Sequence, residues 1–167
     1  IKTGNFLYSN EIATMYLEGD SILWIGCRGS LDKYLINQER FIHHPFRYNT
    51  PDGITDEHIR SITSDKKGNI WVATLKGLNK FQPSTGTWQH FFKDDGLPSN
   101  NIMGLLTDPS NRLWISTEHG LARFDQKTEQ FINFYKEDGL QGNHFHSRAC
   151  HKTNTNELIF GGTNGFT

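Results

Sequence analysis

Histidines and carboxylates are the residues of this 167-residue chain that could carry acid–base or metal chemistry. Among its eight histidines are two close pairs, His43 with His44 and His144 with His146. Positions 144 and 146 would point to the same side of a strand, which could bring two imidazoles near one ion. A structural zinc site needs four ligands, however, and no cysteine or third histidine stands at ligand spacing. The pairs therefore predict exposed loop histidines, with no metal and no cofactor.

Three aspartates recur along the chain, each directly before a glycine, at Asp52, Asp95 and Asp138. A glycosidase needs one unrepeated pair of carboxylates in two different environments. Three copies of one carboxylate instead favour a turn role, in which the side chain bonds the backbone of its own loop. Ser-His-Asp, Cys-His and glycine-rich phosphate-binding arrangements have no local support in the sequence. We therefore expect binding or structure, and no enzyme activity.

These aspartates belong to a segment that is written three times along the chain. Each copy contains a Trp-Ile or Trp-Val pair and a small residue, followed by Gly-Leu, or Ser-Leu in the first copy, and by further aromatics. The tryptophans are Trp24, Trp71 and Trp114, and a fourth, incomplete copy has Ile159 in that position. A period of roughly 40 to 45 residues in a sequence of short apolar runs is typical of β-propeller blades.

Each full repeat is expected to form four short antiparallel strands, which in the third repeat fall at 102–107, 113–117, 121–125 and 130–135. No window has a sustained 3.6-residue apolar period, so we expect almost no helix. The predicted fold class is all-β: a partial propeller of about three full and two partial blades, with Trp, Leu and Phe side chains packed between four-stranded sheets. The expected divisions are 1–10 for the end of a preceding blade, 11–58, 59–101 and 102–143 for full blades, and 144–167 for an incomplete last blade. An alternative is that residues 1–8 complete the fourth blade and close a four-bladed ring.

Composition excludes several classes of partner and linkage. A net charge of −1 and a pI near 6.8 give no basic surface for nucleic acid. No stretch approaches the ~18 apolar residues of a membrane span. The chain begins without Met or an apolar leader, so any targeting signal is expected upstream or removed. Cys27 and Cys150 are too few for a disulfide framework and fall in the first and fourth repeats, so no internal bridge is expected.

Positions where one repeat departs from the others are the better candidates for ligand binding, because recurring residues already have a structural role. The first repeat is lengthened by an insertion in segment 43–50. Arg28 and His119 lie in turns that should share a face with this insertion. In the fourth repeat, either Arg148 or Cys150 stands where the third repeat has Leu105, depending on a two-residue ambiguity in alignment.

A ligand face built from these departures would suit a sugar. An arginine in an apolar slot is costly to bury without a partner. Guanidinium groups bind sulfate or carboxylate, and aromatic rings offer a flat face to a sugar ring. The alternative is a solvated or interdomain surface. The predicted ligand is a carbohydrate, neutral or anionic, and the predicted ligand-binding residues are Arg28, His44, Arg47, Tyr48, His144, His146 and Arg148.

The recurring text, W-[IV]-[GAS]-x3-[GS]-L-x2-[FY] followed by D-G-[LI]-x2-N, resembles the two-component regulator propeller repeat over essentially the whole chain. This resemblance implies the periplasmic sensor part of a hybrid two-component histidine kinase, with seven-bladed propellers that sense glycan fragments without chemistry. It also implies that the other blades and a β-sandwich of the parent sensor are partners. Exposed sheet faces at the ends of an open arc would favour a homodimer. The alternatives are a structural or protein-interaction propeller without a ligand and, with less support, a propeller polysaccharide lyase or hydrolase.

Overall fold

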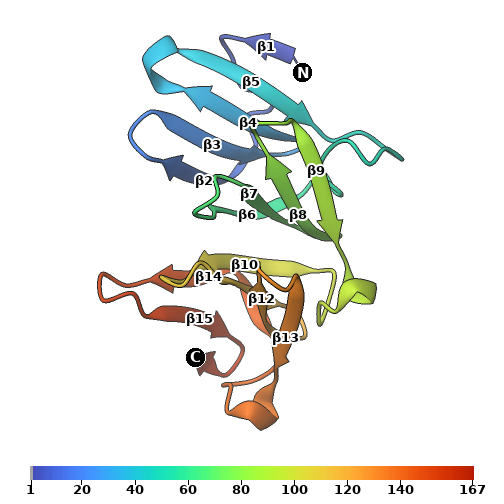
Figure 1. Cartoon of the computed structure of the whole chain (residues 1–167), viewed down its shortest axis with the longest axis vertical. Helices are drawn as coiled ribbons and strands as arrows, with labels where there is room; N and C mark the ends of the chain where they lie inside the picture. Colours follow the sequence, from blue (N-terminus) through green and yellow to red (C-terminus); the bar gives the residue numbers. More distant parts are fainter. Residues whose placement is uncertain (1) are drawn as a thin grey trace.

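The computed structural model describes residues 2–167 as an all-β chain of four antiparallel sheets that follow one another in sequence order. Figure 1 shows the first sheet (blue and cyan) and the fourth sheet (red) at opposite ends of the molecule, with the N and C termini beside them. The four sheets are arranged as the blades of a β-propeller, which confirms the predicted fold class.

Each sheet is a meander of neighbouring strands, and its innermost strand comes first in the chain. The first sheet contains β2 (Ile12–Glu18), β3 (Ile22–Cys27), β4 (Ser30–Leu35) and β5 (Arg40–Pro45), with β1 (Lys2–Gly4) added outside β5. The second contains β6 (Ile59–Ser64), β7 (Ile70–Thr74), β8 (Gly77–Gln82) and β9 (Thr87–Phe91). The third contains β10 (Ile102–Thr107), β11 (Leu113–Thr117), β12 (Gly120–Asp125) and β13 (Gln130–Phe134). The fourth contains β14 (Phe145–Lys152), β15 (Leu158–Gly162) and β16 (Gly165–Phe166).

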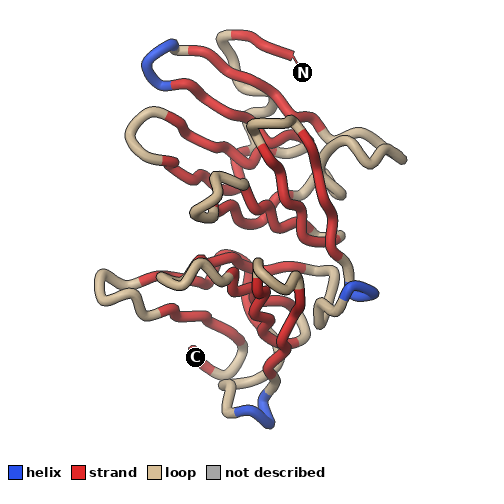
Figure 2. The backbone as a smooth tube through the Cα atoms, in the orientation of Figure 1, coloured by secondary structure: helices blue, strands red, loops and turns tan. Residues whose placement is uncertain are grey.

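Helix is confined, within residues 2–167, to three short 3₁₀ segments, drawn in blue in Figure 2. They are η1 (Ile36–Gln38), η2 (Lys93–Asp95) and η3 (Lys136–Asp138). In η2 and η3 the recurring aspartates accept hydrogen bonds from backbone N–H groups: Phe92 N lies 2.8 Å from Asp95 Oδ2, and Tyr135 N lies 2.9 Å from Asp138 Oδ2. The turn role predicted for these carboxylates is therefore confirmed at Asp95 and Asp138. In the described chain the Asp52 carboxylate accepts no such bond, because the first-repeat insertion alters its loop.

The turn from the first to the second strand of a blade is fixed by a carboxylate that also holds the tryptophan. In the second sheet, Asp65 accepts hydrogen bonds from Lys67 N (2.9 Å), Asn69 N (3.0 Å) and Trp71 Nε1 (2.9 Å). In the third sheet, Asp108 accepts from Trp114 Nε1 at 3.1 Å. The same aspartate thus sets the turn geometry and the orientation of the indole that packs between the sheets.

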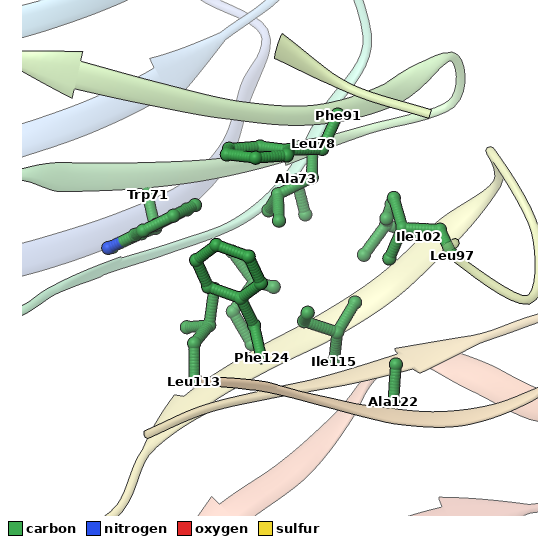
Figure 3. Packing of buried hydrophobic residues seen from close by; sticks show 11 residues of the cluster. Trp71, Ala73, Leu78, Phe91, Leu97, Ile102, Leu113, Ile115, Ala122 and Phe124 are labelled. Carbon is green, nitrogen blue, oxygen red and sulfur yellow. The ribbon is translucent and has the colours of Figure 1, made fainter. Parts of the chain in front are cut away.

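The core lies between consecutive sheets, and Figure 3 shows the cluster between the second and third. Trp71 packs edge-on against Phe124 of the next sheet, with ring centroids 5.4 Å apart. Trp24 packs against Phe81 in the same way, at 6.0 Å. Both tryptophans are fully buried, as the repeat pattern predicts. Trp114 is only half-buried: it stacks on Phe134 of its own sheet at 5.6 Å and packs at the margin of the cluster that contains Phe145 and Phe160 of the fourth sheet.

The small residue after each Trp-Ile or Trp-Val pair permits close approach of neighbouring sheets, as predicted. A Cβ atom added to Gly26 would lie 2.6 Å from Cγ2 of Ile59 in the next sheet, well inside van der Waals contact. Ala73 and Ser116, the equivalents of Gly26, are buried as well. Steric contact therefore limits this position to small side chains.

The N-terminal segment lies where neither prediction placed it. Lys2–Gly4 pairs with Phe41–His43 of β5, so it adds a fifth strand to the first sheet. Tyr8 N donates a 2.8 Å hydrogen bond to the Asp32 carboxylate of β4. This bond holds the segment that follows β1 on the first sheet, so β1 lies within reach of the open edge of β5. The alternative in which residues 1–8 complete the fourth sheet and close a four-bladed ring is therefore wrong for the described residues 2–8. Likewise, β1 does not form a strand of a separate preceding blade.

Candidate functional site

The first strands of the four sheets lie next to one another, and a depression of about 470 Å³ opens among β2, β6 and β14. Its walls come from the connectors that lead into β2 and β6, from the turn between β3 and β4, and from one residue of β14. The lining residues are Asn10, Glu11, Ile12, Ala13, Arg28, Glu57, His58, Ile59, Arg60 and Arg148. Two of the predicted ligand-binding residues, Arg28 and Arg148, thus line one depression.

Arg28 is held at the rim of the depression by two carboxylates. Its guanidinium lies 3.4 Å from Glu11 Oε2 and 3.6 Å from Glu57 Oε1, one from each of the two connectors. Glu57 and Glu11 raise the pKa of Arg28 above its ordinary value. The contacts confirm that this turn shares a face with the connectors. All three side chains are largely exposed, so the ion pairs contribute little to stability.

Arg148 lies in an irregular part of β14. The pairing of β14 with β15 shifts register between Phe145 and Cys150, whereas in β6 and β10 the shift spans a single extra residue. Cys150 pairs with Phe160 as Leu105 pairs with Ile115, so Cys150 occupies the apolar slot. This settles the alignment that the sequence left open. Arg148 is an exposed bulge residue with φ of 63°, a conformation that non-glycine residues seldom adopt.

Sequence reasoning missed Arg60, which lines the same depression. It is the single bulge residue of β6, between Ile59 and Ser61, and is half-buried. The equivalent bulge residues are Ala13 in β2 and Met103 in β10. A comparison of the first three repeats at this one position would have found it, because among these only the second has a charged side chain there.

His44 and Arg47 lie elsewhere, in a smaller groove of about 150 Å³ between the first two sheets. The His44 ring packs among Phe81, Trp24 and Trp88, at centroid distances of 4.6, 6.2 and 6.3 Å. Burial lowers the pKa of His44 to about 4. His44 therefore contributes to the core between sheets, where its ring packs against other aromatic side chains.

Arg47 and Tyr48 are exposed residues of the first-repeat insertion. Arg47 lines the groove with Asp52 and Trp88, but Tyr48 lines neither this groove nor the depression. The Tyr48 side chain is 81% exposed, and its ring lies edge-on to that of Phe46, with centroids 6.4 Å apart. Neither Arg47 nor Tyr48 therefore lines the depression, although Phe46 N donates to the Gly29 carbonyl beside Arg28 at 2.8 Å.

His144 and His146 lie beside the turn between β11 and β12. Their ring centroids are 5.7 Å apart, and His144 Nδ1 lies 3.2 Å from the Glu118 carbonyl oxygen. Among residues 2–167, no three His, Cys, Asp or Glu side chains are grouped closely enough to hold a metal ion. Six of the seven predicted residues therefore fall into three places, and Tyr48 lies in none of them. Of the two cavities that contain predicted arginines, the depression is the larger.

One buried cluster contains the residue types of a hydrolase triad in the wrong order. Ser30 Oγ donates a 2.6 Å hydrogen bond to Asp32 Oδ1, and His43 Nδ1 lies 3.0 Å from the same oxygen without the alignment of a hydrogen bond. In a catalytic triad the histidine lies between the hydroxyl and the acid, whereas here the carboxylate lies between the other two. Phe6 and Tyr8 cover His43 at 6.1 and 6.0 Å. The cluster fixes the N-terminal connector and is closed to substrate.

Comparison with known sequences and structures places these features in context. The sequence model of the two-component regulator propeller family matches residues 53–76 and 96–119. The extracellular domain of a hybrid two-component system from B. thetaiotaomicron has a TM-score of 0.71 and 25% identity, over 93% of this chain and 20% of that one. Virginiamycin B lyase from Staphylococcus aureus has a TM-score of 0.67 but only 13% identity, over 96% of this chain and 56% of that one, which shows the fold alone. No curated protein sequence matches significantly. The chain spans about one fifth of the length of the two-component relative. Residues 2–167 contain no helix with the length and hydropathy of a membrane span.

Proposed function

Because the chain carries two-component regulator propeller repeats and resembles the extracellular domain of a hybrid two-component system, we propose that it is part of an extracytoplasmic sensor propeller. In this proposal the parent sensor lies in the periplasm, binds a glycan fragment and signals the binding event to a kinase. Its other blades and a β-sandwich are the partners of this segment. The observation that carries the binding function is the depression where Arg28, Arg60 and Arg148 converge from three sheets.

Binding without turnover is supported by the chemistry of this depression. Its acidic side chains, Glu11 and Glu57, both lie beside Arg28. Both carboxylates are engaged by one guanidinium and so share one environment, whereas a glycosidase needs two carboxylates in different environments. The recurring Asp95 and Asp138 are engaged by their own loops. Some propellers of low identity, such as virginiamycin B lyase, are enzymes, so turnover must be tested directly.

The test is calorimetric titration of the intact parent sensor domain with neutral and acidic glycan fragments, with product analysis of the same mixtures. We expect saturable binding of at least one fragment, weakened by added salt if the fragment is anionic, and no cleavage products. The Arg148→Ala variant should bind less tightly at an unchanged melting temperature. Cleavage of any fragment would replace the sensor proposal with an enzyme, whereas a domain that binds none would leave a structural or protein-interaction propeller.

We also propose that copies of this chain associate through the faces of their end sheets. Ile12 and Met15 of β2 are 45% and 61% exposed, whereas their equivalents Ile59 and Ile62 are 2% and 6% exposed against the preceding sheet. At the other end, Phe166 is 74% exposed. The face with Ile12 and Met15 is the one that packs against a preceding sheet in the other blades, and the face with Phe166 is the one that packs against a following sheet. The proposed contact therefore joins the first sheet of one copy to the fourth sheet of another, head-to-tail.

A mixing experiment distinguishes this association from a symmetric one. Sedimentation of the wild-type chain should show concentration-dependent association, and the Met15→Glu and Phe166→Glu variants should each be monomeric. An equal mixture of the two variants should form a 1:1 dimer and stop there, because each keeps one intact face. A wild-type chain that remains a monomer at every concentration would contradict the association.

A further inference from the structure

We infer that Arg60 and Arg148 together form an oxyanion site, which binds a sulfate or carboxylate substituent in the depression among β2, β6 and β14. This inference deepens the proposed function and rests on it for the identity of the larger ligand, a glycan with an anionic substituent. The site itself is argued from the charges and backbone of the depression.

Arg60 and Arg148 are the guanidinium groups of this depression that have no ion-pair partner in its lining, and three arginines against two glutamates leave it with a net charge of +1. The carboxylates that line it, Glu11 and Glu57, are both at ion-pair distance from Arg28. The remaining ionisable residue of the lining is His58. Its Nδ1 lies 3.0 Å from Oδ1 of Asp56, a residue that does not line the depression. Within residues 2–167, no carboxylate lies at ion-pair distance from Arg60 or Arg148. The depression therefore presents two planar donor groups that no carboxylate of its own walls contacts.

Both arginines are positioned by β-bulges, which redirect side chains out of the regular strand pattern. Arg60 is the bulge residue of β6, and Arg148 lies in the longer irregular stretch of β14. Arg148 also has φ of 63°, a backbone conformation unfavourable for a side chain with a Cβ. Such conformations are concentrated at binding sites, where the surrounding structure maintains them.

Equivalent positions show that the charge of Arg60 is not required by the blade. The bulge residue is Ala13 in β2 and Met103 in β10, so the sheet forms equally well around an uncharged side chain. Ala13 also lines the depression. Because Arg60 comes from the second sheet and Arg148 from the fourth, one bound oxyanion would bridge two blades.

The experiment titrates inorganic sulfate into the 167-residue chain at low ionic strength, with NMR detection of backbone amides and arginine Nε–Hε groups. We expect saturable shifts confined to the depression, and at least a tenfold loss of affinity, about 1.4 kcal/mol, in each of Arg60→Ala and Arg148→Ala. Arg148→Lys should lose less, because it keeps the charge but not the fork. Arg47→Ala, an exposed arginine of the separate groove, is the matched control and should bind sulfate as wild type does.

The inference is overturned if no saturable shift is found, if the shifts lie outside the depression, or if both alanine variants bind sulfate like wild type. Melting temperatures of all variants test whether a loss of binding reflects a loss of folding; Arg148→Lys, with the smallest change, keeps the comparison possible if an alanine variant unfolds. The same titration of the parent domain separates this inference from the proposed function. Sulfate binding through Arg60 and Arg148 without any glycan binding would refute the glycan sensor alone, whereas glycan binding unaffected by either variant would refute the oxyanion site alone.

Discussion

Replacement of Trp71 by alanine should lower the free energy of unfolding by about 3–5 kcal/mol. Trp71 has no exposed surface and fills the space between the second and third sheets, where it contacts Phe124 at 5.4 Å and Phe91 at 5.8 Å. The substitution removes that packing, leaves a cavity and takes a donor from Asp65. Urea unfolding followed by far-UV circular dichroism measures the loss without relying on the deleted fluorophore.

Two matched variants separate packing from hydrogen bonding. Trp71→Phe keeps an aromatic ring but removes the Nε1–H donor, and should cost about 1–2 kcal/mol, since Asn69 Nδ2 still donates to Asp65 Oδ2 at 2.9 Å. Trp114→Ala should cost less than Trp71→Ala, because Trp114 is half-buried and stacks mainly on Phe134 of its own sheet, at 5.6 Å. A Trp71→Ala variant within about 1 kcal/mol of wild type would contradict the role assigned to the inter-sheet core.

The arrangement of strands could be predicted from the sequence because each repeat carries its own local signals. The third repeat illustrates this: strands expected at 102–107, 113–117, 121–125 and 130–135 are found at Ile102–Thr107, Leu113–Thr117, Gly120–Asp125 and Gln130–Phe134. Turn residues such as Asp108 fix the hairpins, and the period of the aromatics fixes which faces are buried. The place of β1 could not be predicted in this way, because its position depends on the tertiary bond from Tyr8 to Asp32.

The candidate site was only partly predictable, since it depends on how strands are offset. Arg28 was found because its turn recurs in every blade. Arg148 was found as a departure from the pattern, but the register of β14 assigned the apolar slot to Cys150. Arg60 was missed because a bulge residue has no fixed inward or outward direction in a two-residue alternation. His44 was predicted as a ligand-binding residue because it lies in the first-repeat insertion, although the repeat also placed it in an aromatic position.

That position of His44 leads to a pH dependence of stability. The equivalents of His44 on the fourth strands of the next two sheets are Phe91 and Phe134, paired with Leu78 and Leu121 as His44 pairs with Leu31. The imidazole therefore replaces a phenyl ring between two sheets. Burial lowers its pKa from the ordinary 6.5 to about 4, because a charged ring would lose its hydration there.

Between these two values the unfolded chain binds a proton at His44 that the folded chain does not. The stability linked to His44 is therefore complete above pH 6.5, decreases as the pH falls, and is lost once the pH passes below about 4. The loss should reach at most about 3 kcal/mol.

Urea unfolding of wild type and His44→Phe between pH 7 and pH 4 measures this loss, and the difference between the two proteins isolates this residue from other titrating groups. We expect the two unfolding free energies to diverge progressively toward pH 4, with His44→Phe the more stable. A difference that stays constant across this range would show that His44 is protonated as readily in the folded chain as in the unfolded one, and that its ring is not held in the core.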